Sequence, residues 1–277
     1  MTVSKKITAS LAAFLIAALT GQAVLAADNE KFDVAGFTLG MTPEQALQAL
    51  REYGADDASI SETQSSYSYS DGLNHDYRTE AFVSRISAAK TRRFENGREH
   101  TDSVNLYFSP PPEGGRLVGL ERLVRNRIDP VTNGEFRDAI IDKYGEPTAA
   151  NASASMVNWK FGGGDKNCLS TGLDGVGVQL PDVRKNKNIL DVVYRRTGGS
   201  YRLDLFRVSA VKNLEECANM LEFRLGSNGS RPADDVTTLM IDVQSWVRAE
   251  LAAGEELEKL RQAAIEKRQG KGKKPAL

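Results

Sequence analysis

The chain has few of the residues on which metal and nucleophilic chemistry depend. Its 277 residues include two histidines and two cysteines. Zinc sites use several nitrogen or sulfur ligands, so this supply gives little support to a zinc centre. The glycine-rich stretch at 161–177 lacks the Gly-Lys-Ser/Thr ending of a phosphate-binding loop, and Leu169 and Ser170 stand where a calcium loop needs a ligand and a glycine. We therefore predict a loop between strands at 161–177, with no metal and no cofactor.

Long apolar runs are also scarce, and the main one lies at the amino terminus. It covers residues 7–19, which is too short to span a bilayer comfortably. Two lysines precede it, and small or compact residues follow at 24–26, which is the pattern of a cleaved secretory signal. We predict a signal peptide over residues 1–26, cut between Ala26 and Ala27. The mature chain is then periplasmic or secreted and has no transmembrane segment; an uncleaved anchor is the alternative.

The mature chain has no large excess of charge of either sign. Two of the 36 basic residues lie in the predicted signal peptide, so 34 remain against 37 acidic residues, a formal charge of −3. This balance gives no general attraction to nucleic acid, and we predict no nucleic-acid partner. Positive charge gathers locally, with ten basic and six acidic residues between positions 78 and 127.

This local positive charge defines a candidate partner-binding face. Its arginines are Arg85, Arg92, Arg93, Arg116, Arg122 and Arg125. Interleaved with aromatic residues, they suit an acidic partner or an anionic envelope polymer. The alternative is the solvated side of an antiparallel sheet, where arginine and glutamate pair across strands.

The two cysteines, Cys168 and Cys217, both lie in the exported part of the chain. An even number of cysteines in an oxidising compartment favours a disulfide. In the chain-entropy model, closing a loop of this size stabilises the fold by about 4 kcal/mol. Two buried free thiols are the alternative.

Two stretches ninety residues apart carry the same helix signals. Each has a threonine followed three residues later by Gln or Glu, which is a capping box, and each ends at Tyr-Gly. The residues are Thr42, Gln45, Tyr53 and Gly54 in the first stretch, and Thr132, Glu135, Tyr144 and Gly145 in the second. Because each position has a structural reason, the repeat indicates two helix starts and stops rather than a catalytic motif.

Extended runs follow both helices. They cover 81–88, 103–109 and 116–124 after the first helix, and 155–161, 175–180, 189–194 and 201–208 after the second. Several alternate apolar and polar residues, the period of a half-buried strand. We further expect a third capped helix from Asn213 that carries Cys217 toward Gly226. The stretch 237–243 is predicted as a last strand, with a helix nearly as plausible.

The fold class is therefore predicted as α+β, with two tandem helix-plus-antiparallel-sheet units and a C-terminal charged helix. We place the first unit at 27–127 and the second, with the disulfide, at 128–245. The charged helix is expected at 246–269 and a disordered basic tail at 270–277.

Two passages resemble one group of small exported helix-plus-sheet domains. GFTLGMTPEQALQAL at 36–50 is similar to the opening G-x-x-x-G-M-[ST]-x-x-[QE]-[AV] of that group, and KYGEPT followed by NWKF at 158–161 is similar to a later passage. The group includes the outer-membrane assembly lipoproteins of the SmpA/OmlA type and the β-lactamase inhibitory protein. The resemblance implies a non-catalytic module whose sheet contacts another protein. The lipid-attachment cysteine is missing and the spacing is looser, so a role in barrel assembly is not implied.

Four short patterns resemble catalytic or metal-binding constellations. They are Ser87 with Lys90, Ser209 with Lys212, Asp71 with His75 and Asp76, and Glu99 with His100 and Asp102. A serine–lysine nucleophile needs its serine at a helix start and its lysine one turn inside, and neither pair has that setting or companion motifs. Both histidine groups fall in polar stretches, so we expect surface loop residues there. The chain is predicted not to be an enzyme.

These features predict a non-catalytic binding or adaptor protein of the cell envelope. Its partner is expected to be another envelope protein, bound through an exposed sheet face or the C-terminal helix. Basic residues near the end of the chain can contact an anionic envelope surface or act as a solubilising tail. They are Lys267, Arg268, Lys271, Lys273 and Lys274. The alternatives are an envelope-directed hydrolase and a protein that binds an anion or anionic polymer.

Overall fold

The computed structural model of the chain describes residues 32–73, 75–95, 97–169, 173–176 and 213–269. Several predictions fall outside these residues: the cleavage site at Ala26–Ala27, most of the strand at 175–180, the strands at 189–194 and 201–208, the Ser209–Lys212 pair and the tail at 270–277. They remain predictions.

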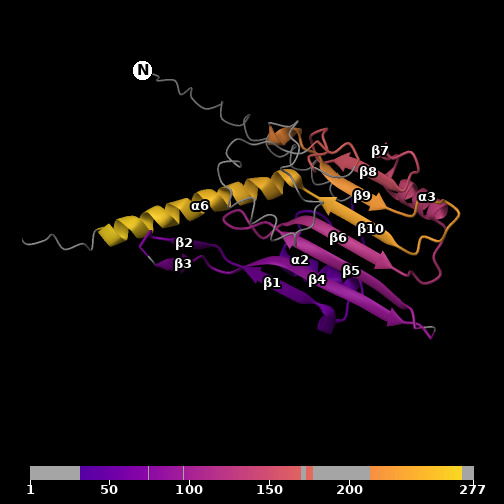
Figure 1. The fold of residues 1–277 in the computed structure, drawn as a ribbon, viewed down its shortest axis with the longest axis horizontal. Helices are drawn as coiled ribbons and strands as arrows, with labels where there is room; N and C mark the ends of the chain where they lie inside the picture. Colours follow the sequence, from indigo (N-terminus) through magenta and orange to yellow (C-terminus); the bar gives the residue numbers. More distant parts are fainter. Residues whose placement is uncertain (1–31, 74, 96, 170–172, 177–212, 270–277) are drawn as a thin grey trace, which may run out of the picture.

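The main body of the described residues is one antiparallel sheet of eight strands with helices on both faces (Figure 1). The first unit supplies α2 (Pro43–Glu52), β1 (Ser61–Ser65), β4 (Phe82–Arg93), β5 (Glu99–Phe108) and β6 (Leu117–Arg125). The second supplies α3 (Asn133–Tyr144), β7 (Ala149–Ala150), β8 (Met156–Phe161), β9 (Asn219–Arg224) and β10 (Val236–Ile241). The strand order is β1-β4-β5-β6-β10-β9-β8-β7, so the last strands of the two units pair at the centre. The predicted α+β class is confirmed, and the strands of both predicted units join one continuous sheet.

Both predicted capping boxes are present. The Thr42 hydroxyl accepts a hydrogen bond from the Gln45 backbone N–H at 3.3 Å, and the Gln45 side-chain oxygen accepts one from the Thr42 backbone N–H at 2.9 Å. Thr132 and Glu135 repeat this exchange at the start of α3. Capping satisfies backbone N–H groups that have no partner inside the helix, so both helices begin where the threonines place them.

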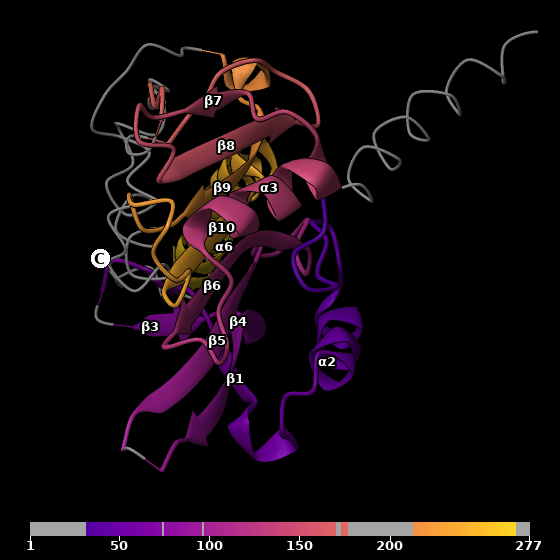
Figure 2. The same cartoon turned by 90° about the vertical axis from the view of Figure 1, so that its right-hand side faces the viewer.

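The larger core lies between the sheet and the helices α2 and α3. Buried side chains of α2 and α3, such as Leu50 and Ile140, belong to the same cluster as Ile86, Leu106 and Trp159 of the sheet. Figure 2 shows that α2 lies beside one face of the sheet. Alternate strand residues point to opposite faces, so the other face needs its own cover.

The helix α6 (Val243–Gln269) supplies part of that cover. Its first turns bury Trp246 and Val247 in a second cluster with Tyr107 of β5 and Val118 of β6. Trp246 lies directly on Gly119, where a Cβ atom would come within 2.6 Å of the indole ring. A glycine at this position of β6 is therefore what lets the helix approach the strand.

The predicted disulfide between Cys168 and Cys217 is confirmed, with Cα atoms 5.4 Å apart. Both residues are fully buried in the second cluster. The glycine-rich loop passes close beside them, because a Cβ on Gly164 would meet the Cys217 backbone at 2.5 Å. Packing against the disulfide explains the glycine at this position, as expected for a loop between strands.

A projecting part of the molecule was not predicted. The hairpin of β2 (Ser68–Ser70) and β3 (Asp76–Arg78) lies beside the outer half of α6, which extends beyond the sheet (Figure 1). The carboxylate of Glu250 joins the two, because it accepts hydrogen bonds from the Trp246 indole N–H at 3.2 Å and from the Tyr67 hydroxyl at 3.0 Å. We call the hairpin, with residues 254–269 of α6, the arm.

Two sequence-based expectations are wrong. A short 3-10 helix at Leu214–Glu216 replaces the helix expected from Asn213, and Cys217 leads into strand β9. Neither histidine group consists of surface loop residues alone. Glu99, His100 and Asp102 belong to strand β5, where Asp102 is buried. Asp71 is buried as well, and Asp76 belongs to β3. Among the described residues, no helix is long and apolar enough to cross a membrane.

Candidate functional site

The six arginines of the candidate partner-binding face do not share one surface. Strand alternation places Arg92 and Arg122 on the face that α2 and α3 cover. It turns the strand residues Arg85, Arg93 and Arg125 to the opposite face. Arg116 precedes β6 and donates a hydrogen bond to the Gly40 carbonyl. The net charge counted along the sequence is therefore divided between the two faces.

Arg122 is committed to an internal ion pair. Its guanidinium donates two hydrogen bonds to Asp102 on the neighbouring strand β5, at 2.9 and 2.8 Å. The side chains of Asp102 and Arg122 are 8% and 28% exposed, so this is a largely buried, bidentate pair. Arg93 also pairs with the residue opposite it, Glu99, although that contact is exposed and long at 3.9 Å. Both contacts join an arginine to an acidic residue on the neighbouring strand. Such cross-strand pairing is the alternative to a partner-binding face that the sequence left open.

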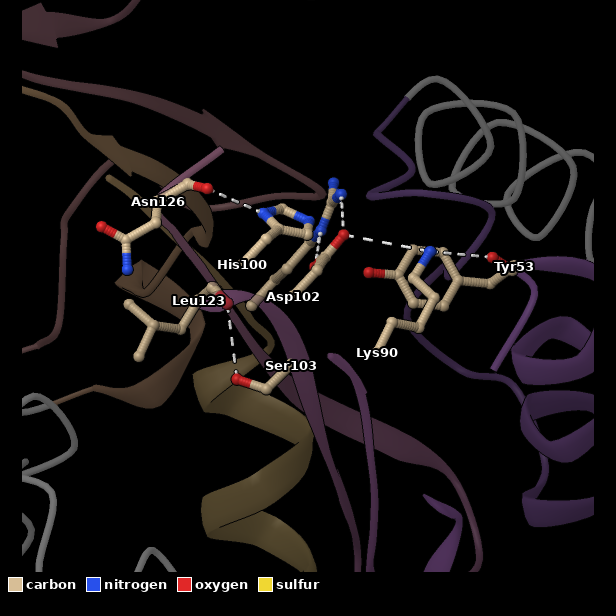
Figure 3. Close-up of polar contacts among 8 residues, drawn as sticks. Tyr53, Lys90, His100, Asp102, Ser103, Leu123 and Asn126 are labelled. Atoms are coloured by element: carbon tan, nitrogen blue, oxygen red, sulfur yellow. Dashed lines mark hydrogen bonds and ion pairs between the residues drawn. The ribbon is translucent and has the colours of Figure 1, made fainter. Parts of the chain in front are cut away.

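Lys90 and Tyr53 extend this cluster toward α2 (Figure 3). The Lys90 ammonium lies 3.3 Å from the centre of the Tyr53 ring and donates a hydrogen bond to the Tyr53 backbone carbonyl at 3.0 Å. It also lies 3.9 Å from the Asp102 carboxylate. Tyr53 is the C-cap residue of α2, so the cluster fastens the end of that helix to the sheet.

The cluster shifts the pKa values of its members. Burial alone would raise the pKa of Asp102, but the hydrogen bonds and charge of Arg122 outweigh it and hold that pKa below its usual value. Burial, with help from the neighbouring Asp102, raises the pKa of Tyr53 well above its usual value. Burial is also the main reason why the pKa of Lys90 is lowered. At neutral pH the cluster therefore consists of a charged Asp102 carboxylate that faces the cations Arg122 and Lys90. We interpret it as a structural ion-pair cluster rather than an acid–base pair.

A cavity of about 270 Å³ opens beside this cluster, and we call it the central pocket. Its polar lining is His100, Asp102, Arg122, Arg127 and Thr238. Its apolar lining is Val124, Ile128, Phe136, Phe223 and Val236. These residues come from both units, on either side of the β6–β10 pairing. The His100 Nδ1 atom lies 3.2 Å from the Asn126 carbonyl, which fixes the ring at one end of the pocket (Figure 3).

A second hollow, of about 500 Å³, lies within the arm, and we call it the arm groove. The rings of Tyr69 and Tyr77 stack on its hairpin side, with centres 5.3 Å apart. Leu260 and Ala264 line the α6 side, and two cations stand at one end. These cations are Lys267 and Arg268, and neither forms an ion pair with any described residue.

The other sequence candidates are placed as follows. Ser87 and Lys90 lie three residues apart on strand β4, so their side chains point to opposite faces and cannot exchange a proton. Asp71 and His75 both line the arm groove, and Asp71 accepts a hydrogen bond from the Leu73 N–H of its own turn. The described residues contain no group of three or more side chains arranged to hold a metal ion.

Comparison of the chain with family models, with curated proteins and with solved structures finds no match. The resemblance to exported helix-plus-sheet domains therefore remains an expectation from two short passages. The function has to be argued from the geometry described above.

The sequence missed most of the residues that line the two hollows. Thr238 and Arg127 stand more than a hundred positions apart, and only the pairing of β10 with β6 brings Thr238 close to the segment that follows β6. The tyrosines of the arm groove sit in short polar strands without apolar alternation. A pair of tyrosines flanking a Gly-containing turn was the one signal available, and it is too common to indicate a site.

Proposed function

We propose that this is a non-catalytic binding protein of the cell envelope, and that it holds another envelope protein at the arm groove. The observation that carries the proposal is the arm itself. It extends beyond the sheet, and it lays two stacked tyrosines opposite a helix across an open hollow of about 500 Å³. Rigid aromatic side chains in a hollow are the usual anchors of protein interfaces.

Exposed apolar side chains support this choice of surface. Three large apolar residues of the described chain are strongly exposed, and two of them, Leu73 at 63% and Tyr77 at 41%, belong to the hairpin turn and β3. The third, Val131 at 45%, lies outside the arm, just before α3. Neighbouring exposed apolar residues at the tip of a projecting hairpin suit a contact surface better than a solvated turn.

The charge of the groove indicates the chemistry of the bound segment. Lys267 and Arg268 are unpaired with described residues, whereas the nearby Arg261 and Lys259 of α6 are paired with glutamates. An acidic segment of the partner would neutralise Lys267 and Arg268 while an apolar side chain enters between Tyr77 and α6. We therefore infer an acidic segment with an apolar anchor.

The proposed location rests on two supports. The disulfide between Cys168 and Cys217 belongs to proteins of oxidising compartments. The predicted signal peptide over residues 1–26 would deliver the chain to the periplasm or beyond. The envelope is therefore where the partner is to be sought.

The test is site-specific photo-crosslinking in cells that export the full chain. A photoreactive phenylalanine analogue is placed at position 77 and, in a matched control, at position 131, which is similarly exposed. We expect one dominant envelope protein to be captured from position 77 and not from position 131. Mass spectrometry of the crosslink should map it to an acidic segment of that protein.

Charge reversal completes the test. The double variant Lys267→Glu/Arg268→Glu should reduce capture several-fold, because it places negative charge against an acidic segment. The control Lys259→Glu/Arg261→Glu changes the net charge of the same helix by the same amount, at residues that do not line the groove. Equal capture from positions 77 and 131, or equal loss in both double variants, would show that the arm groove is not the binding site.

A further inference from the structure

The central pocket lies at the seam of the two units and is distinct from the arm groove. Strand register places Arg122 of β6 opposite Thr238 of β10, and Thr238 opposite Phe223 of β9. Phe136 of α3 and Arg127 of the connection before it close one side. The pocket therefore exists only because both units contribute to one continuous sheet.

Thr238 carries the first indication of a ligand. The residue is 2% exposed and lines the pocket, yet its hydroxyl forms no hydrogen bond with any described residue. The hydroxyl is not sealed inside the protein, so it faces the pocket and can donate a hydrogen bond to a molecule bound there. Its neighbours on this face of β10 are Val236 and Met240, so its own strand offers the hydroxyl no partner, and we read it as serving a molecule from outside the chain.

Arg127 carries the second indication. Its guanidinium stacks on the Phe136 ring, 5.3 Å from the ring centre, and forms no ion pair with the described residues. Stacking holds the planar group in place and leaves the N–H groups at its edge free for a planar anion. The charge of Arg122 is balanced by Asp102, so Arg127 leaves the pocket with one net positive charge.

The rest of the lining sets the size and the polarity of the ligand. Phe136, Phe223, Val124 and Val236 give an apolar surface next to the Arg127 guanidinium. The volume of about 270 Å³ is just below the range of about 300–1,000 Å³ typical of pockets for drug-sized ligands. The occupant is therefore a small molecule that joins one anionic group to a compact apolar body.

We propose that the central pocket binds a small organic carboxylate. The carboxylate pairs with the Arg127 guanidinium and accepts a hydrogen bond from the Thr238 hydroxyl, and the apolar body lies against Phe136 and Phe223. Inorganic anions lack the apolar body, and polymeric anions exceed the volume. The binding is independent of the partner bound at the arm.

The test is a titration of the full chain with benzoate, followed in amide proton–nitrogen correlation spectra. Benzamide supplies the same shape without the charge, and inorganic phosphate supplies charge without the apolar body. We expect benzoate to shift the Thr238 amide signal saturably, with a Kd at least about tenfold lower than that of benzamide or phosphate, because a hydrogen bond to a charged group is lost in the first case and apolar burial in the second.

Two variants locate the site. Arg127→Gln and Thr238→Val should each weaken benzoate binding by about tenfold or more, since each removes one polar contact while keeping a similar shape. Arg125→Gln is the matched control, because Arg125 is the last residue of β6, two positions before Arg127, and its side chain lies on the opposite face of the sheet. The absence of a saturable shift with benzoate, equal binding of benzamide, or equal loss in Arg125→Gln would overturn the proposal.

Discussion

Replacing Asp102 by asparagine is expected to lower the free energy of unfolding by about 3 kcal/mol at neutral pH. The substitution keeps the side-chain shape but leaves Arg122 and Lys90 facing each other without their shared anion. Breaking one side of a buried ion pair costs about 3–5 kcal/mol. The lower value applies because the Arg122 side chain is still 28% exposed, so water screens part of the unbalanced charge.

The cost should depend on pH in one direction only. Arg122 holds the pKa of Asp102 below its usual value in the folded protein, so the folded state binds this proton more weakly than the unfolded state. The stabilisation by Asp102 is therefore fully present above the unfolded pKa of about 3.9 and is lost as pH falls through the folded value. The difference between the wild-type chain and Asp102→Asn should be largest near neutral pH and shrink below about pH 4.

Urea unfolding followed by tryptophan fluorescence measures this difference, because the only two tryptophans, Trp159 and Trp246, are both buried. Asp57→Asn is the matched control, since Asp57 pairs with Arg51 at a fully solvated site where the two side chains are 77% and 61% exposed. That change should cost under about 1 kcal/mol. Equal losses for the two variants, or a loss at Asp102 that is unchanged down to about pH 3, would refute the assignment.

Two further predictions concern the opposite face of the sheet. Reducing the Cys168–Cys217 disulfide, which spans 49 residues, should lower the free energy of unfolding by about 4 kcal/mol. Urea unfolding with and without reductant measures this loss, and a loss below about 1 kcal/mol would contradict the loop-entropy argument. The variant Gly119→Ala should lower the free energy of unfolding by about 1–3 kcal/mol, because its Cβ would meet the Trp246 ring at 2.6 Å. It should also alter the near-ultraviolet circular dichroism of that tryptophan. An unchanged spectrum would mean that α6 does not pack on β6.

Local sequence signals predicted the parts of the fold that depend on neighbours in the chain. Thr42 and Thr132 start their helices because the groups that cap them lie three residues away. The alternation of Val157, Trp159 and Phe161 predicted β8, since each of these side chains points into the same core. Such signals operate within a few residues and survive in any tertiary setting.

The predictions failed where distant contacts outweigh local preference. Asn213 does cap a helical turn, but the disulfide at Cys217 and pairing on both edges draw the following residues into β9. Asp102 was assigned to a polar surface because no sequence pattern reveals that Arg122 stands beside it on the next strand. The six arginines predicted to form one face lie on both faces of the sheet, because successive strand residues point to opposite sides. Binding surfaces assembled from four strands cannot be found in a single sequence.

The pairing of β6 with β10 has a consequence for how the chain reaches its folded state. β6 is complete at Arg125, but the strand that covers its edge does not begin until Val236. During synthesis, the first unit therefore presents an open strand edge for as long as the second unit is unfinished. Open edges recruit other strands, including those of identical chains. This exposure ends only when the second half of the chain arrives to close its own sheet.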